Sequence, residues 1–419
     1  MRRCPVIDPA YFEFSCQVQL VAGDRALEGI PALLAPHGGR RPMVLTDAGV
    51  KSAGLLDILL SALAPELTPA AVEDEVPPDS DLVRVTELAK IYRDNGCDSL
   101  IALGGGSVLD TAKGINILVS EQGEDLMAFT GTGALKRPLR PLIAVPTTAG
   151  TGSEVTKVAV IADHANHQKL AFMSPFLLPH AAVIDPRMTL TLPPHITALT
   201  AMDALSHALE SMFCLGRNPI SHAHAFQAVT LIREHLVSVV EQPDDAQGRL
   251  ALALAATLAG MAFSNSMVGM VHCLGHSVGG VCGVAHGTCM GILLPYGMEY
   301  NRHKAPQIMG DLLLPLAGPE IFTTTAPKNR AQEAVAQVRA LNQALHQATQ
   351  GRHPVRFKDC LSPDGSPAVP RESIPAIADT ALGDGSLMYN PEDMDRTDFI
   401  TVLEAAWEGR PLFAKENGI

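Results

Sequence analysis

Several features typical of nucleic-acid-binding, secreted or membrane proteins are missing from this sequence. Its 419 residues carry a formal net charge of −13 and contain no dense run of Lys or Arg, which argues against a nucleic-acid partner. The N-terminal segment MRRCPVIDPAYFEF has no apolar core of the kind found in signal peptides. The longest apolar stretch, residues 250–263, is rich in alanine and too short to span a bilayer, so it predicts a buried helix and no membrane partner.

The cysteines also lack a recognisable arrangement. The eight of them form no CxxC pair and no regular framework, which predicts reduced, mostly buried thiols and a cytoplasmic location. Apolar residues make up 47% of the chain and charged residues 18%, so we expect a globular protein. Its length is that of two domains.

The first half of the chain alternates between strand-like and helix-like segments. Four short β-rich runs, each followed by Gly, Pro or a polar turn, occupy residues 43–46, 99–103, 142–145 and 182–184. This alternation predicts an α/β domain with a mainly parallel sheet. Two further β-rich segments, residues 155–162 and 168–173, flank the polar turn DHANH and predict a β-hairpin that projects from the sheet.

The pattern changes after Asp185-Pro186. The following segments have helical apolar spacing or are apolar all round, with no convincing strand between them, so the second half is predicted to be all-helical. We place the boundary within residues 186–194, which gives an α/β domain over 1–188 and a helical domain over 189–419. Residues 350–370 are proline-rich and without periodicity, and they predict a surface loop.

A glycine turn joins a predicted strand to a predicted helix in SLIALGGGSVLDTAKGINILV, residues 99–119. Gly105 and Gly106 would allow backbone N–H groups to approach a phosphate at the helix N-terminus, and Ser107 would cap the helix or donate to a phosphate oxygen. The spacing is not the G-x-G-x-x-G of a Rossmann fingerprint. The glycines have an alternative explanation, because many strand–helix turns use them for geometry alone.

Two further polar segments follow predicted strands. Asp47 ends the first strand, where a carboxylate would bind ribose hydroxyls and repel a 2′-phosphate, which favours NAD over NADP; it would serve equally as a helix N-cap. A hydroxyl-rich loop after the strand at 142–145 favours ligand binding, and it contains Thr147, Thr148, Thr151 and Ser153. Lys169 on the hairpin would reach a nucleotide or remain solvated.

Four residues of the second half form a candidate set of metal ligands. Asp203 and His207 are four residues apart in AMDALSHALESM and would share one face of a helix; His272 and His286 follow in VHCLGHSVGG and AHGTCMG. One carboxylate and three imidazoles suit a divalent first-row metal such as iron or zinc better than magnesium or calcium. Because cysteines 273, 282 and 289 lie nearby, a zinc site that contains cysteine is an alternative.

These motifs, in this order, resemble the iron-containing (group III) alcohol dehydrogenase family, whose fold is shared with dehydroquinate synthase. The matching segments span residues 11–305 and resume weakly over 389–407; the carrying motifs are VLTDAG, ALGGGSVLDTAKG, VPTTAGTGSEVT, AMDALSHALES, VHCLGHSVGG and AHGTCMGILLPYGMEYN. Residues 315–380 depart from the family pattern, being longer and richer in proline.

The resemblance implies an NAD-linked alcohol dehydrogenase or aldehyde reductase that transfers a hydride between a metal-bound alkoxide and nicotinamide, in a cleft between its two domains. It implies Fe(2+), with Zn(2+) as the alternative, on the four ligands named above. The implied cofactor-binding residues are Asp47, Gly105, Gly106, Ser107, Asp110, Thr147, Thr148, Thr151, Ser153 and Lys169. His276, one turn beyond His272, would lie near the nicotinamide and relay the alcohol proton, or else only pack; His222 and His224 are expected to be structural.

The substrate implied is a small alcohol or aldehyde, and the assembly a homodimer or higher homo-oligomer. One alternative is a metal- and NAD-dependent lyase or cyclase of the dehydroquinate synthase type, although the basic residues that its polyhydroxylated carboxylate substrate needs are not evident near the ligand motifs. A second alternative, of another class, is a non-catalytic protein that binds a metal or a nucleotide.

Overall fold

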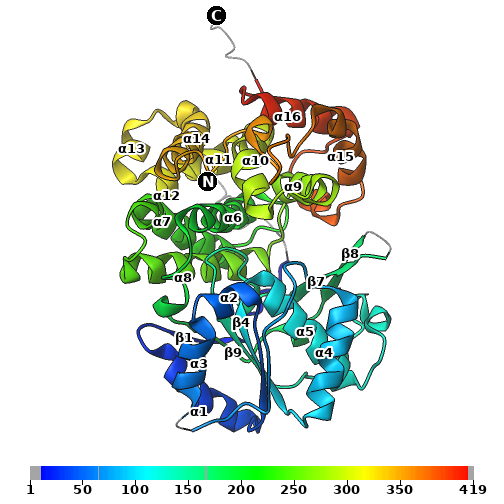
Figure 1. Ribbon diagram of the computed structural model, residues 1–419. Helices are drawn as coiled ribbons and strands as arrows, with labels where there is room; N and C mark the ends of the chain where they lie inside the picture. Colours follow the sequence, from blue (N-terminus) through cyan, green and yellow to red (C-terminus); the bar gives the residue numbers. More distant parts are fainter. Residues whose placement is uncertain (1–10, 65, 166–167, 414–419) are drawn as a thin grey trace, which may run out of the picture. The chain divides into compact units, whose positions relative to one another are not determined.

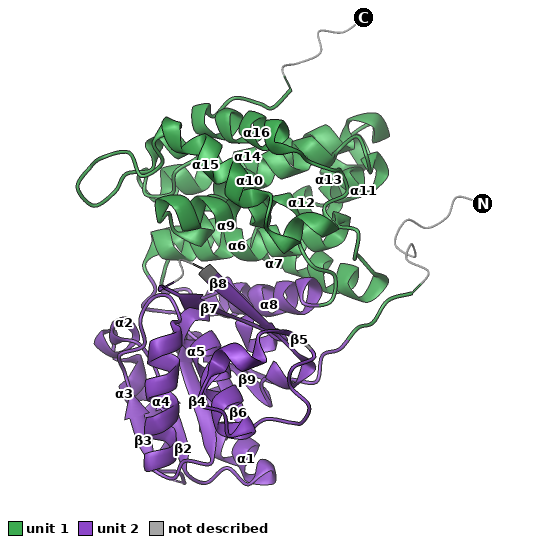
Figure 2. Cartoon of the chain, turned by 90° about the vertical axis from the view of Figure 1, so that its right-hand side faces the viewer, with its two compact units in different colours: residues 1–14, 193–243, 265–419 green, residues 15–192, 244–264 purple. Residues whose placement is uncertain are grey.

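The structure is a computed structural model that describes residues 11–64, 66–165 and 168–413 (Figure 1). The chain divides into two compact units (Figure 2): unit 1 is bounded by residues 1–14, 193–243 and 265–419, and unit 2 by residues 15–192 and 244–264. The change of unit after residue 192 lies within the expected boundary region. The division differs from the predicted domains in two places, because residues 244–264 group with the α/β unit and the segment before residue 15 groups with the helical unit.

Unit 2 is built around a six-stranded, all-parallel sheet of order β1-β9-β6-β4-β2-β3. Its strands are β1 (Gln19–Ala22), β2 (Pro42–Leu45), β3 (Ala71–Glu73), β4 (Ser99–Gly104), β6 (Leu142–Pro146) and β9 (Ala181–Ile184). The four strands predicted from β-rich runs are thus confirmed. Strands β1 and β3 were not predicted, because these short strands at the two edges of the sheet are exposed or half-buried.

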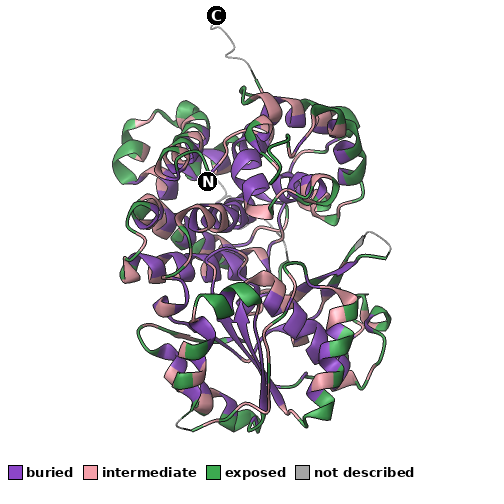
Figure 3. Ribbon diagram, viewed as in Figure 1, coloured by how far each residue is buried: buried purple, intermediate pink, exposed green. Residues whose placement is uncertain are grey.

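Each central strand contributes to two hydrophobic cores. Leu100 and Ala102 of β4 pack with α4 (Leu82–Asp94) and α5 (Gly106–Glu121). Ile101 and Leu103 of the same strand pack with α1 (Ile30–Leu34) and α3 (Leu55–Leu63) on the opposite face. This follows from the period of two in a strand, and a sheet covered on both faces therefore has continuously apolar strands. Figure 3 shows these strands as buried. The covering helices are α1 (Ile30–Leu34), α2 (Ala48–Ser52), α3 (Leu55–Leu63), α4 (Leu82–Asp94) and α5 (Gly106–Glu121).

The predicted hairpin is confirmed. Strands β7 (Val158–Asp163) and β8 (Gln168–Met173) pair antiparallel, and β5 (Gly131–Thr132) adds to β8 in a separate three-stranded sheet. Residues 166 and 167 of its turn lie outside the described part of the chain.

Helix α8 (Ala246–Phe263) covers the part of the sheet near β9. Its Ala253 and Met261 pack with Ala182 and Ile184 of that strand in a small apolar cluster. Within the described residues, α8 is the single helix long and apolar enough to cross a membrane, with a mean hydropathy of 1.3, and 61% of its residues are buried. Its packing on β9 is that of a core helix, as the sequence predicts.

Among its described residues, unit 1 contains helices and no strand. Its helices are α6 (Pro194–Phe213), α7 (Pro219–Glu241), α9 (Met270–Cys282), α10 (His286–Asn301), α11 (Pro306–Asp311), α12 (Leu313–Ala317), α13 (Pro319–Thr324), α14 (Arg330–Ala348), α15 (Ile374–Ala381) and α16 (Arg396–Glu408). Residues 350–370 lack a regular element longer than one short turn, but the segment is not wholly on the surface. His353, Phe357 and Val369 are buried and anchor it.

Candidate functional site

Three helices of unit 1 bring the four predicted metal ligands together. Helix α6 begins at Pro194, a favourable first position, and carries Asp203 and His207 on one face. Helix α9 places His272 in its first turn, and α10 begins at His286. Helix α10 packs on both α6 and α9, so residues 83 positions apart in sequence become neighbours.

The possible ligand atoms converge on Asp203. Its Oδ1 lies 3.7 Å from Nδ1 of His207, 3.7 Å from Nε2 of His272 and 3.3 Å from Nε2 of His286. One ligand atom each from Asp203, His207 and His272 lies within 4.8 Å of the other two, and these three residues are buried. The His286 side chain is 39% exposed, which leaves one side of the cluster accessible. In the described part of the chain, the group contains no cysteine, in contrast to the zinc alternative considered above.

The electrostatics of this cluster suit the binding of a cation. Oδ1 of Asp203 and Nε2 of His272 are buried, and neither has a hydrogen-bond partner among the described residues. Burial alone would raise the pKa of Asp203, but the imidazoles of His207 and His286 bring it well below its usual value. Burial lowers the pKa of His207 to about 3, which favours the neutral imidazole that binds metals. Burial alone would lower the pKa of His272, but the carboxylates of Glu210 and Asp203 raise it to about 9. A buried carboxylate and imidazole nitrogens gathered in this way fit a divalent ion.

His276 lies next to this cluster and is held by a residue that the sequence analysis missed. Its ring stacks on that of His286, with centroids 5.3 Å apart, and its Nδ1 lies 2.8 Å from Oδ2 of Asp384. Protein atoms around the imidazole lower its pKa, although 45% of the side chain remains exposed. Asp384 caps the short turn Gly385–Tyr389, so its position is fixed by the backbone.

A second missed residue is Glu210, which is fully buried on α6 and contacts Nδ1 of His272. It lies three residues beyond His207, and the available signal was a second acidic residue on a helix that is mostly buried. His222 and His224, expected to be structural, lie on α7; Nδ1 of His224 is 2.7 Å from the carbonyl oxygen of Ile220, and its ring stacks on Phe14.

In unit 2, the predicted nucleotide-binding segments meet at the carboxyl edge of the sheet. Strands β2, β4 and β6 are neighbours in the sheet, and each is followed by a predicted cofactor residue. Gly105 and Thr147 come directly after β4 and β6, and Asp47 comes shortly after β2. The helices after β2 pack on one face of the sheet and α5, after β4, packs on the other. The crevice at such a topological switch point is where open α/β sheets bind ligands.

The predicted cofactor residues differ in what their side chains do. Asp47 accepts the N–H of Val50 at 2.9 Å and so caps α2, which was the alternative to a role in ribose binding. The hydroxyl of Ser107 donates to the carbonyl of Pro78 and caps no helix, because the N-cap of α5 is Gly105. Lys169 is exposed, with Nζ 3.2 Å from Oδ1 of Asp79.

The side chains of Asp110 and Ser153 form hydrogen bonds within the protein. The hydroxyl of Ser153 donates to Oδ1 of Asp110 at 2.7 Å, while Oδ2 of Asp110 accepts the N–H of Val160 at 3.0 Å. Burial raises the pKa of Asp110. These two residues therefore hold the threonine loop, residues 147–156, against α5.

The other threonines of the loop approach the glycine turn. A Cβ built on Gly105 would lie 3.4 Å from Cγ2 of Thr148, and one built on Gly106 would lie 3.0 Å from Cγ2 of Thr151. A side chain at Gly105 would thus make ordinary van der Waals contact with the loop, whereas one at Gly106 would press against Thr151. Thr147 is buried and its N–H donates to the carbonyl of Gly104 at 3.1 Å.

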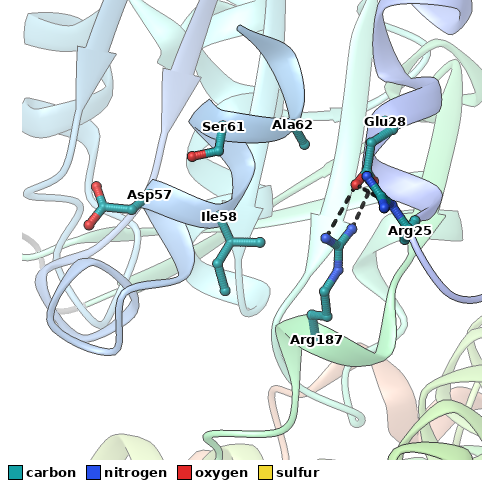
Figure 4. Close-up of a pocket in the computed structure, with 7 residues that line it drawn as sticks. All are labelled: Arg25, Glu28, Asp57, Ile58, Ser61, Ala62 and Arg187. Atoms are coloured by element: carbon teal, nitrogen blue, oxygen red, sulfur yellow. Dashed lines mark hydrogen bonds and ion pairs between the residues drawn. The ribbon is translucent and has the colours of Figure 1, made fainter. Parts of the chain in front are cut away.

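A separate hollow on unit 2 is lined by none of the predicted site residues. Figure 4 shows Arg25 and Arg187 around Glu28 on one side of it and Asp57 on the other. Glu28 accepts from Arg187 at 2.8 Å and from Arg25 at 3.0 Å, so both cations are already paired. We assign no function to this hollow.

Comparison with known proteins covers both units. The family model described as iron-containing alcohol dehydrogenase matches residues 18–186, and the C-terminal model of the same family matches residues 197–407. The NAD-dependent methanol dehydrogenase of Bacillus methanolicus is 35% identical over 67% of this chain and 74% of its own length. The 1,3-propanediol dehydrogenase of Klebsiella pneumoniae is 32% identical over 88% of this chain and 92% of its own. A crystal structure of 1,3-propanediol oxidoreductase superposes with a TM-score of 0.88 at 30% identity, covering 94% of this chain and all of the other.

A doubly wound α/β unit, a helical unit with a buried carboxylate–imidazole cluster and these relatives define an oxidoreductase that acts on alcohols. The chain belongs to the iron-containing alcohol dehydrogenase family.

Proposed function

We propose that the chain is a metal- and NAD-dependent dehydrogenase that interconverts a small alcohol and its aldehyde. The observation that carries this proposal is the convergence of Asp203, His207, His272 and His286 in one buried cluster. The relatives named for methanol and 1,3-propanediol support a short alcohol as the substrate.

The four converging residues are proposed to hold the metal, iron in preference to zinc. The donor set fits because an acidic oxygen and imidazole nitrogens suit such an ion, and because two of the atoms are buried without another partner in the described chain. When bound, a divalent metal would act as a Lewis acid for the substrate oxygen. The exposed side of His286 provides access for that oxygen.

NAD is proposed to bind at the carboxyl edge of the sheet in unit 2. The N–H groups of Gly105 and Gly106 begin a helix of 16 residues, whose dipole favours a pyrophosphate. Thr147, Thr148 and Thr151 would line the dinucleotide, and Lys169 would contact a ribose. The carboxylate of Asp47 disfavours the 2′-phosphate of NADP. Ser107 would contribute its backbone, while Asp110 and Ser153 would act by holding the loop.

His276 is proposed to move the alcohol proton. Its Nδ1 is engaged by Asp384, so Nε2 is the nitrogen available to accept the proton from the hydroxyl and to pass it to water. An imidazole is suited to this task because it exchanges protons near neutral pH. The half-exposed ring has a path to solvent.

The test combines metal analysis with turnover. Protein purified without chelators should contain iron, and it should form NADH from methanol or 1,3-propanediol. We expect His272→Ala to lose turnover while it still binds NAD, and His224→Ala, which removes an imidazole outside the cluster, to keep both. A His272→Ala variant with unchanged turnover would overturn the proposal. Net NADH formation would also exclude the lyase, which uses NAD only transiently and which the relatives do not favour.

A cytoplasmic location and a homo-oligomeric state are part of the proposal. The seven described cysteines are free thiols, which suits a reducing compartment. Light scattering of the purified chain would measure the assembly, and a monomer would contradict that part.

A further inference from the structure

Glu210 links the two helices that carry the inner residues of the cluster. It is completely buried on α6, and its carboxylate reaches the start of α9. Oε1 accepts the backbone N–H groups of Gly269 at 3.0 Å and Val271 at 2.9 Å, and Oε2 contacts Nδ1 of His272. One carboxylate therefore caps a helix and engages the imidazole on that helix at the same time.

This arrangement differs from the other helix caps of the chain. Helices α4, α8 and α16 are capped by aspartates at their own N-cap positions, namely Asp81, Asp245 and Asp395. The N-cap of α9 is Gly269, where a Cβ would lie 2.8 Å from Oδ1 of Asn390 and 3.2 Å from Oε1 of Glu210. A local capping side chain has no room there, so the cap comes from α6.

The contact decides which nitrogen of His272 is free. A carboxylate only accepts hydrogen bonds, so Nδ1 of His272 must carry a hydrogen. In the neutral form of the ring, which is the form that binds a metal, the lone pair is then on Nε2. This atom lies 3.7 Å from Oδ1 of Asp203 and has no hydrogen-bond partner within the described residues. Outer carboxylates that fix the tautomer of a ligating histidine are a general feature of metal sites.

We propose that Glu210 is a positioning residue, which fixes the Nδ1–H tautomer and the orientation of His272 so that Nε2 is presented to the metal. This inference rests on the proposed metal site. A purely structural cap would stabilise α9 without any effect on metal affinity, and that difference makes the two roles separable.

The main test is Glu210→Gln in the full-length protein. The amide oxygen can still accept from Gly269 and Val271, but the NH₂ group then faces Nδ1 of His272 and drives the ring hydrogen to Nε2. We expect the affinity for Zn(2+), measured by competition with a chromophoric chelator, to fall about 10- to 100-fold. The unfolding temperature of the metal-free protein should change little, because the cap is retained.

Glu154→Gln is the matched control. Glu154 is a buried carboxylate in unit 2 that accepts from the hydroxyl of Thr257 at 2.7 Å, so the same substitution leaves the histidine cluster untouched. Its Zn(2+) affinity should equal that of the wild type. A double-mutant cycle then combines Glu210→Gln with His272→Ala. Because Glu210 acts through His272, we expect the double variant to lose no more Zn(2+) affinity than His272→Ala alone.

Glu210→Asp covers the case in which the glutamine variant does not fold. It keeps the acceptor charge, so a folded aspartate variant should bind Zn(2+) within about tenfold of the wild type. Loss of more than 100-fold in this variant would overturn the inference, as would equal Zn(2+) affinity in wild type and Glu210→Gln. A wild-type protein that binds neither Zn(2+) nor Fe(2+) would instead remove the proposed metal site itself.

Discussion

The carboxylate of Asp384 lies 2.8 Å from Nδ1 of His276, although the two residues are 108 positions apart in sequence. Burial would raise the pKa of Asp384, but the hydrogen bond from His276 is among the contacts that lower it to about 2, so the group is an anion that orients the ring. Asp384→Asn would present an NH₂ group to Nδ1 and reverse the tautomer. We expect kcat to fall about 100-fold or more, the scale of a general acid–base contribution.

The metal content of Asp384→Asn should match the wild type, since the substitution touches none of the proposed ligands. Asp379→Asn is the control, because Asp379 is an exposed acid on α15 that pairs with Arg396 at 2.6 Å. Its kcat should stay unchanged. A wild-type kcat in Asp384→Asn would show that His276 does not depend on this contact.

Metal binding should stabilise the protein through Asp203. The ligand atoms are gathered in the folded state only, so a bound ion adds a free energy of unfolding of about 4 kcal/mol at a free concentration 1,000 times its Kd. We expect the unfolding temperature to fall after treatment with a chelator and to recover when Fe(2+) or Zn(2+) is added back. Asp203→Asn should abolish the recovery. Identical melting curves with and without metal in the wild type would contradict a site in this cluster.

Gly260 of α8 and Gly152 of the threonine loop are in direct contact. A Cβ on Gly260 would lie 2.8 Å from the carbonyl oxygen of Gly152 and 2.8 Å from Cγ2 of Val155, so the loop or the helix must move. Gly260→Ala should lower the free energy of unfolding by about 1–3 kcal/mol, the usual cost of overpacking. It should also weaken NAD binding, measured by fluorescence titration, because the displaced loop carries the proposed cofactor residues.

Gly280 in α9 provides the comparison for that prediction. No atom outside its immediate neighbourhood lies within 4 Å of a Cβ built there, and alanine is the better helix former by about 1 kcal/mol. Gly280→Ala should therefore leave stability unchanged or raise it. Equal stability of both variants would mean that the contact between loop and helix yields without cost.

Local patterns were sufficient to predict the core strands and the ligand-bearing helix. Because successive residues of β4 face two different cores, residues 100–103 are all apolar, and a glycine turn marks the end of the strand. The strand could therefore be predicted over 99–103. Asp203 and His207 share a face because a helix repeats every 3.6 residues, which spacing alone reveals. These features depend on residues close together in the chain.

Contacts between distant segments could not be predicted in the same way. Glu210 and Asp384 act on histidines that lie 62 and 108 residues away, and no periodicity reports such a pairing. Helix α8 was expected in the helical domain because it follows two helices, yet its apolar face packs on β9 in unit 2. The hydrogen bond from the Ser107 hydroxyl to the Pro78 carbonyl is likewise a tertiary contact, and the glycine-turn motif does not predict it.

Lys113 of the glycine-turn helix gives a prediction about stability and pH. Its fully buried amine lies within hydrogen-bond distance of five oxygens, which share its three hydrogens. Three of them are the carbonyl oxygens of Ser153 at 2.8 Å, Thr156 at 3.0 Å and Val158 at 2.7 Å. It therefore pins the end of the threonine loop to α5. Burial lowers the pKa of this amine from 10.5 to about 8.

Between pH 8 and 10.5, the unfolded chain therefore binds more protons at Lys113 than the folded one. The free energy of unfolding must therefore rise with pH across this window. Below pH 8 the amine is protonated in both states, and this gain in stability is absent. A shift of this size corresponds to about 3 kcal/mol. Lys113→Met removes the titration, so the wild type should gain about that much relative to the variant between pH 7 and 10.5.

Denaturant unfolding of both proteins at several pH values measures this difference, and groups common to both cancel. The variant should be less stable at every pH, since five buried oxygens lose their donor, and it should bind NAD more weakly because its loop is released. A constant stability difference from pH 7 to 10.5 would show that the amine keeps its ordinary pKa. In that case the hydrogen bonds to the surrounding oxygens would offset the cost of burying the charge.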